Sequence, residues 1–86
     1  MLKILYHKDF QKDFKKLSRN FRLLFNKKFL IFVENPDCVF LKDHALKGRL
    51  EGRRAFSATG DIRVVYRYVE EDIVMLLRIG SHNQVY

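Results

Sequence analysis

The segment Gly80–Tyr86 (GSHNQVY) contains the pair of side chains in this chain that is best suited to chemistry. It follows an apolar run typical of a strand, and it places His82 four positions before Tyr86. Histidine exchanges protons near neutral pH, because its ordinary pKa is about 6.5. Tyrosine can stack on an unpaired base or act on a hydroxyl proton. The pair therefore suggests proton transfer on a nucleic acid, and the alternative is a well-packed terminal strand.

The charge of the chain indicates the class of partner on which this pair would act. Seventeen Lys and Arg residues oppose ten Asp and Glu residues, which gives a formal net charge of +7 at pH 7. An excess of this size favours phosphate backbones or an acidic protein partner, and charge alone does not choose between the two. Together with the terminal pair, it favours a small enzyme that acts on RNA.

Arg63 is the candidate for binding a phosphate group. Its guanidinium is always charged and presents a planar fork of donors that suits phosphate oxygens. Successive side chains of a strand point to opposite faces, so Arg67 is expected on the face of Arg63, opposite the alternating apolar residues of Ile62–Tyr68. The pattern predicts a strand with one basic track and one apolar side.

Length and composition exclude several other classes of protein. A chain of 86 residues, 48% of them hydrophobic, is expected to form one domain (1–86) with one modest core and no separate cofactor domain. The longest apolar run, Phe29–Val33, is far too short to span a membrane, and the first residues lack the apolar core of a signal peptide, so we expect a cytoplasmic protein. Cys38 has no second cysteine, no His/Cys cluster has zinc spacing and no glycine-rich loop suits a nucleotide, so no metal or cofactor is expected.

The elements that must position these residues begin with a mainly helical half. Met1–Tyr6 alternates weakly and predicts a short strand. Apolar residues then recur at three- and four-residue intervals, which predicts one helix over Lys8–Leu17 and a second from Phe21 to Asn35. Pro36 disfavours helical geometry at the residue before it and so ends the second helix. The two helices are expected to form an antiparallel hairpin.

The second half of the chain is expected to be mainly strands. Asp37–Gly52 has no sustained period, so it is a connection that can carry function. Alternation then predicts strands at Arg53–Ala58, Asp61–Val69 and Asp72–Ile79, with a tight hairpin at Glu70–Glu71. The sequence therefore predicts an α+β fold, in which an N-terminal strand and a two-helix hairpin pack on a mostly antiparallel sheet of about four strands.

Three blocks of residues in this order resemble the RelE/ParE superfamily of toxins. They are Asp43–Gly48 (DHALKG), Gly60–Tyr66 (GDIRVVY) and Arg78–His82 (RIGSH), with a terminal aromatic residue at Tyr86. The resemblance covers nearly the whole chain, because the strand, helix, helix and three-strand order also fits the RelE-like fold.

Within that superfamily, the chain is most similar to the YafQ-like ribonuclease toxins. Their pattern has a histidine in a His-x-Leu-x-Gly block, an aspartate that opens the third strand and a near-terminal histidine, and His44, Asp61 and His82 occupy these positions. The branch often has a second-strand histidine where this chain has Ser57. Arg63 instead resembles the third-strand arginine of RelE-like members, which is thought to hold the scissile phosphate.

The resemblance implies a metal-independent endoribonuclease that cleaves mRNA in the ribosomal decoding site and is held inactive by a cognate antitoxin. The implied reaction is attack of a 2′-hydroxyl on the adjacent phosphate, which needs a proton acceptor, charge stabilisation and a donor to the leaving oxygen. The candidate catalytic residues are His82, Arg63, Tyr86, His44 and Asp61. The candidate RNA-binding residues are Arg53, Arg54, Arg67, Lys47 and Arg49.

Alternatives to these roles and to this function follow from the same residues. His44 could anchor its loop, Asp61 follows a glycine as turn residues commonly do, and alternation allows only one of Arg53 and Arg54 to face RNA. His7 is expected to be structural or to lie on the surface. The alternative functions are a ParE-like inhibitor of DNA gyrase, which needs no catalytic residues, and an RNA-binding member that has lost catalysis.

Overall fold

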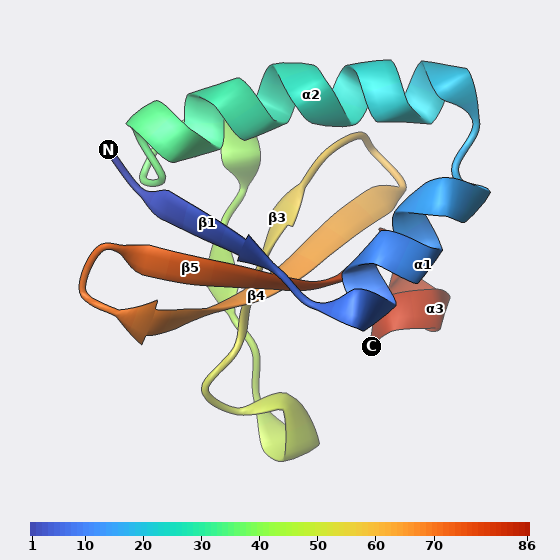
Figure 1. Ribbon diagram of the computed structural model, residues 1–86. Helices are drawn as coiled ribbons and strands as arrows, with labels where there is room; N and C mark the ends of the chain where they lie inside the picture. The colour runs from blue at the N-terminus through green and yellow to red at the C-terminus, as the bar shows by residue number, and fades with distance from the viewer.

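A five-stranded mixed sheet forms the centre of the computed structural model, which describes residues 1–86 (Figure 1). The elements in chain order are β1 (Lys3–Tyr6), α1 (Lys8–Lys16), α2 (Arg19–Glu34), β2 (His44–Ala45), β3 (Arg54–Ser57), β4 (Ile62–Glu70), β5 (Ile73–Ser81) and α3 (His82–Val85), with short 3₁₀ turns at Val39–Leu41 and Gly48–Leu50. The strand order is β1-β5-β4-β3-β2, in which β1 is parallel to β5 and the other neighbours are antiparallel. This arrangement confirms the predicted α+β fold with a mostly antiparallel sheet.

The structure differs from the sequence prediction in its strand count and in one turn. The sheet has five strands instead of about four, because the short segment His44–Ala45 pairs with Ala55 and Arg54 at the edge of the sheet. The hairpin between β4 and β5 turns at residues 71–72, one position later than predicted, since β4 continues through Glu70. No helix of the structure is long and apolar enough to cross a membrane.

Both long helices begin at a side-chain cap. The imidazole Nδ1 of His7 accepts the backbone N–H of Asp9 at the start of α1, at 3.0 Å. The hydroxyl of Ser18 accepts the N–H of Phe21 at the start of α2, at 3.2 Å. α2 ends at Glu34, before Asn35 and Pro36, as predicted. The two helices run in opposite directions and are inclined to each other, with α2 across the sheet and α1 beside the end of β5 (Figure 1).

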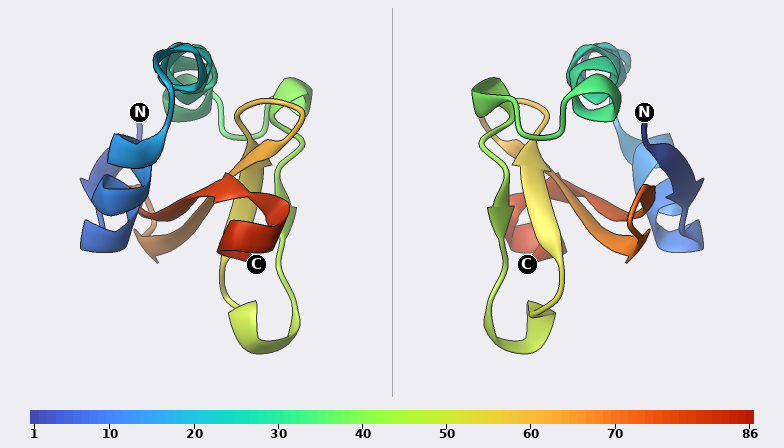
Figure 2. Two further views of the ribbon diagram at one scale, coloured as in Figure 1. Left: turned by 90° about the vertical axis from the view of Figure 1, so that its right-hand side faces the viewer. Right: turned by 90° about the vertical axis from the view of Figure 1, so that its left-hand side faces the viewer.

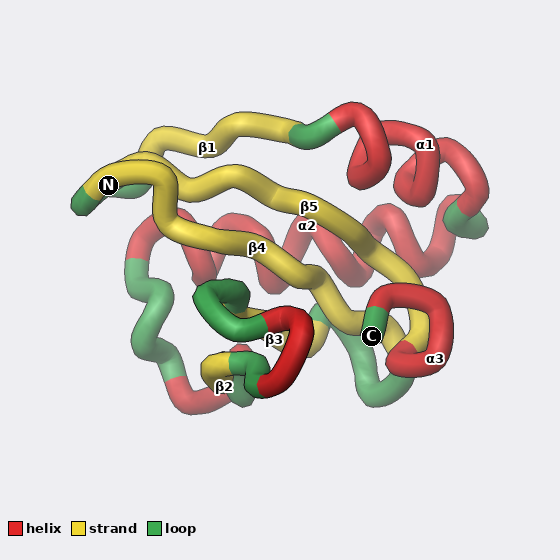
Figure 3. Tube along the Cα trace, turned by 90° about the horizontal axis from the view of Figure 1, so that it is seen from below, coloured by secondary structure: helices red, strands yellow, loops and turns green.

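The sheet buries apolar side chains on both of its faces. α2 covers one face of the sheet (Figure 2). On this face Phe32, Phe56 and Tyr66 pack with ring centroids 4.6 to 6.0 Å apart. α3 lies against the opposite face (Figure 3). A smaller cluster there joins Ala55, Val65 and Val85. The second cluster places the C-terminal residues on the face of the sheet that α2 leaves open.

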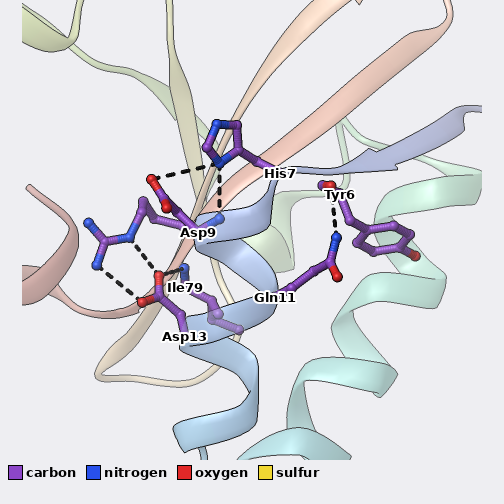
Figure 4. Close-up of polar contacts among 7 residues, drawn as sticks. Tyr6, His7, Asp9, Gln11, Asp13 and Ile79 are labelled. Atoms are coloured by element: carbon purple, nitrogen blue, oxygen red, sulfur yellow. Dashed lines mark hydrogen bonds and ion pairs between the residues drawn. The ribbon is translucent and has the colours of Figure 1, made fainter.

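α1 is fastened to the exposed edge of β5 by one carboxylate. β1 pairs with β5 only over Ile73–Leu76, so the N–H groups beyond it need another acceptor. Asp13 accepts the Arg78 Nε–H at 2.6 Å, an Arg78 Nη2–H at 3.1 Å and the Ile79 backbone N–H at 3.1 Å (Figure 4). This contact sets α1, and His7 before it, close to the chain that continues into α3.

Candidate functional site

The terminal pair lies on a helical turn instead of a strand. The backbone N–H of Ser81 donates to the side-chain oxygen of Gln84 at 2.9 Å, which starts α3. A Cβ on Gly80 would lie 2.7 Å from that same oxygen, so a larger residue at this position would displace the Gln84 side chain. The ring centroids of His82 and Tyr86 are 4.4 Å apart and meet edge to face. The alternative of a terminal strand is therefore wrong for residues 82–85.

Tyr86 lines a cavity, whereas its hydroxyl is buried. The residue packs against the cluster of Ala55, Val65 and Val85, and its hydroxyl oxygen is buried without a hydrogen-bond partner. Burial raises the pKa of Tyr86, and the positive charge of Arg63 opposes that rise in part. Tyr86 thus keeps its proton at neutral pH, and in this conformation only its ring can contact a ligand.

Arg63 is held beside Tyr86 by the turn between β3 and β4. Its Nη1 donates to the carbonyls of Thr59 and Gly60 at 3.2 and 3.0 Å. A guanidinium has five N–H groups, so those on Nε and Nη2 remain available to a phosphate. Arg63 pairs in register with Ser57 on one side and Gly80 on the other, next to the start of α3.

An apolar residue interrupts the basic track predicted along β4. Val65 lies between Arg63 and Arg67 on the same face, and only 1% of it is exposed because Val85 and Ala55 cover it. The face opposite α2 therefore has an apolar centre with an arginine on each side. Arg67 is exposed and pairs with Met75, beyond a register shift that follows Val65.

His44 and Asp61 are exposed and less closely tied to this centre. The Nδ1 of His44 is 3.2 Å from the carbonyl oxygen of Lys42, as expected of a loop anchor, and its cross-strand partner is Ala55. Directly paired residues share a face of the sheet, so His44, Ala55 and Val65 lie on the same face. Two strand spacings separate β2 from β4, so His44 is about 10 Å from Val65. The turn that contains Asp61 is organised by Thr59, whose hydroxyl accepts the N–H groups of Asp61 and Ile62.

Arg53 and Arg54 have different environments, as alternation predicts. Arg54 pairs with Asp43 at 2.6 Å, and the hydroxyl of Tyr66 also donates to this carboxylate. Burial and the hydrogen bond to Asp43 raise the pKa of Tyr66 far above its usual range. Arg54 thus holds the segment before β2 against the sheet, and Asp43 engages its guanidinium. Arg53 is exposed and has no acidic partner.

A cavity of about 410 Å³ opens beside Tyr86, between the start of α1, the turn Gly48–Leu50 and α3. It brings together predicted and unpredicted residues: Arg49, Arg53 and Tyr86 were candidates, whereas His7, Arg78 and Asn83 were not. Lys47 lies just before the turn and is exposed. No three His, Cys, Asp or Glu side chains lie close enough together to hold a metal ion.

Comparison with known proteins places the chain in a family. Residues 2–86 match the family described as YafQ, a bacterial toxin of type II toxin–antitoxin systems. The chain belongs to the YafQ toxin family. No curated protein sequence matches it.

Several solved structures have a similar fold. A copper-bound mutant toxin from Helicobacter pylori is 33% identical, with a TM-score of 0.76 and 100% coverage of both chains. YafQ from Escherichia coli strain BL21(DE3) is 20% identical, with a TM-score of 0.83 and coverage of 100% of this chain and 99% of that one. YafQ in the Escherichia coli DinJ–YafQ complex is 23% identical, with a TM-score of 0.72 and coverage of 100% of this chain and 99% of that one.

The position of Tyr86 in this YafQ-family toxin leads to a stability prediction. We expect Tyr86→Phe to raise the free energy of unfolding by about 1 kcal/mol, because the hydroxyl is buried without a partner and such groups destabilise the fold. Urea denaturation measures the change. Tyr6→Phe is the control, because Tyr6 is 47% exposed and should leave the free energy of unfolding unchanged. A loss of 1 kcal/mol or more in Tyr86→Phe, by the same estimate, would mean that the hydroxyl has a partner.

Proposed function

We propose that this toxin is an endoribonuclease that cleaves mRNA by attack of a 2′-hydroxyl on the adjacent phosphate. The observation that supports the proposal is the grouping of three side chains at the start of α3. The ring centroids of His82 and Tyr86 are 4.4 Å apart, and Arg63 pairs across the sheet with Gly80, two residues before His82. These residues combine a proton-transfer group, an aromatic surface and a fixed cation, which is what the reaction requires.

Each residue has a distinct part in the proposed reaction. His82 is exposed and transfers a proton, either from the 2′-hydroxyl or to the leaving 5′-oxygen. The bond from the 2′-oxygen to phosphorus forms while the bond from phosphorus to the 5′-oxygen breaks. The free N–H groups of Arg63 bind the phosphate oxygens as negative charge builds on them. The ring of Tyr86 stacks on a neighbouring base, and its buried hydroxyl takes no part.

The second proton-transfer group is less constrained. Ser57, at the position where the family resemblance implies a histidine, is buried and pairs with Arg63. A serine hydroxyl does not titrate near neutral pH, so it cannot replace an imidazole in this role. His44 is on the same face and exposed, and we propose that it supplies or removes the second proton. Asp61, exposed in the adjoining turn, is proposed to contact the RNA sugar.

We also propose a cognate antitoxin and the translating ribosome as partners. The similar fold of YafQ in the complex with DinJ supports the first, and the net charge of +7 supports binding to an acidic antitoxin and to RNA. The proposed site of action is the cytoplasm, where translated mRNA is found.

Primer extension on a translated message tests the function. The purified toxin should introduce cuts in mRNA on programmed ribosomes, and prior addition of the antitoxin should abolish them. The absence of cuts at any toxin concentration would contradict the proposal. A parallel DNA supercoiling assay tests the main alternative, a ParE-like inhibitor of DNA gyrase. Inhibition of gyrase without RNA cleavage would favour that alternative over the proposed ribonuclease.

A further inference from the structure

The cavity beside Tyr86 has the position and size of a subsite for one nucleotide. Its volume of about 410 Å³ lies within the range of small-ligand sites. Tyr86 forms part of its wall and also contacts His82, so the cavity adjoins the proposed reaction centre. Its remaining walls come from the start of α1, the turn Gly48–Leu50 and β5, which are distant in the sequence.

The charges around the cavity leave one cation without a partner. Arg78 is paired with Asp13, and a guanidinium N–H of Arg49 donates to the main-chain oxygen of Tyr86. Arg53 is exposed and makes no ion pair. The acidic residue on the wall is Asp9, whose carboxylate is 3.7 Å from the imidazole of His7. Arg53 is therefore the group that would bind a phosphate here.

Two neutral groups on the wall can contact a base. The Nδ1 of His7 accepts the backbone N–H of Asp9, so in the neutral imidazole the proton is on Nε2, and no residue accepts it (Figure 4). Asn83 is exposed and its amide makes no hydrogen bond within the chain. Donors of this kind bind the edges of unpaired bases, and the ring of Tyr86 offers a surface on which a base can stack.

We propose that this cavity binds the nucleotide next to the scissile phosphate, with Arg53 on its phosphate and His7 and Asn83 on its base. The inference rests on the proposed function and assigns its substrate contacts. One free cation, two neutral polar groups and an aromatic ring match a single nucleotide. An acidic peptide would instead need several cations, and two of the three arginines on this wall are already engaged.

Binding of an RNA that cannot be cleaved tests the subsite separately from the reaction. A single-stranded oligonucleotide with 2′-O-methyl sugars lacks the attacking hydroxyl, and fluorescence anisotropy measures its affinity. Arg53→Gln should weaken binding about tenfold and lower the slope of log K against log salt by about 0.7, the value for one phosphate contact on a single strand. Arg19→Gln, exposed on α2, removes the same charge far from the cavity and should change the affinity by less than about twofold.

Substitution of His7 tests the base contact. His7→Asn keeps an N-cap oxygen for α1 and removes the imidazole, so the fold should be retained while the affinity falls by about threefold to tenfold, as one lost hydrogen bond implies. Amide chemical shifts of residues 7, 53 and 83 should change when the RNA is added. Equal effects of Arg53→Gln and Arg19→Gln, or shift changes with an oligoglutamate peptide and none with RNA, would overturn the proposal. If wild type binds the RNA in the cavity and yet cleaves no message, the subsite stands and the proposed function fails.

Discussion

Replacing His82 with glutamine is expected to lower the rate of RNA cleavage by about 10²- to 10⁴-fold, which is the range that general acid–base catalysis contributes. Glutamine has a similar size and forms hydrogen bonds, but it does not exchange a proton near neutral pH. His82 is exposed on α3, so the substitution removes no core packing. Single-turnover cleavage of a message on programmed ribosomes measures the rate.

Two further measurements separate proton transfer from a structural role of His82. The wild-type rate should depend on pH if a titrating side chain transfers the proton, and that dependence should weaken in His82→Gln. Lys12→Gln, exposed on α1, is a control for a polar substitution outside the site and should cleave at the wild-type rate. A rate for His82→Gln within about threefold of wild type would exclude His82 as a proton-transfer group, since that is far below the expected loss.

Local signals explain why the sequence predicts the helices and the long strands. The end of α2 is set by Pro36, and its start by the hydroxyl of Ser18, so each boundary depends on one neighbouring residue. The strand β4 alternates visibly because Ile62 and Val64 face α2. In contrast, β2 is a strand only because His44 and Ala45 meet β3, and two residues have no periodicity of their own.

α3 is a missed element for which the sequence does contain a signal. Ser81 and Gln84 have the spacing of a capping box, which marks a helix start, and the contact between them is formed. The apolar run of β5 before them favours a continued strand, and a turn of four residues is too short to show a helical period. The helical turn matters for the proposed function, because it converts the four-residue spacing of His82 and Tyr86 into a direct contact.

The cavity residues show the limit of sequence reasoning about the site. His7 is some 80 positions before Tyr86, and the two reach one cavity only because β1 lies parallel to β5 and Asp13 holds α1 against Arg78. The sequence also does not predict the ion pair of Arg54, since its partner Asp43 lies before β2, in a different segment of the chain. Basic residues can be counted in a sequence, but the ion pairs that engage them depend on contacts between distant segments.

Replacing Arg63 with glutamine is expected to lower the cleavage rate by about 10²- to 10³-fold, the loss typical when a donor to the developing charge is removed. Arg63 has one observed role and one proposed role, because its Nη1 fixes the turn at Thr59 and Gly60 while its other N–H groups remain free for the proposed contact to the phosphate. Arg63→Lys keeps the charge but cannot make both sets of contacts, so we expect an intermediate rate.

Loss of the turn could itself lower the rate of Arg63→Gln, and Thr59→Ala is the control for that effect. The hydroxyl of Thr59 accepts the N–H groups of Asp61 and Ile62, so its removal loosens the same turn and leaves the guanidinium in place. If Arg63 stabilises the transition state, Arg63→Gln should reduce the rate far more than it reduces affinity for uncleavable 2′-O-methyl RNA. Equal losses of rate in Thr59→Ala and Arg63→Gln would instead show that Arg63 acts through the turn.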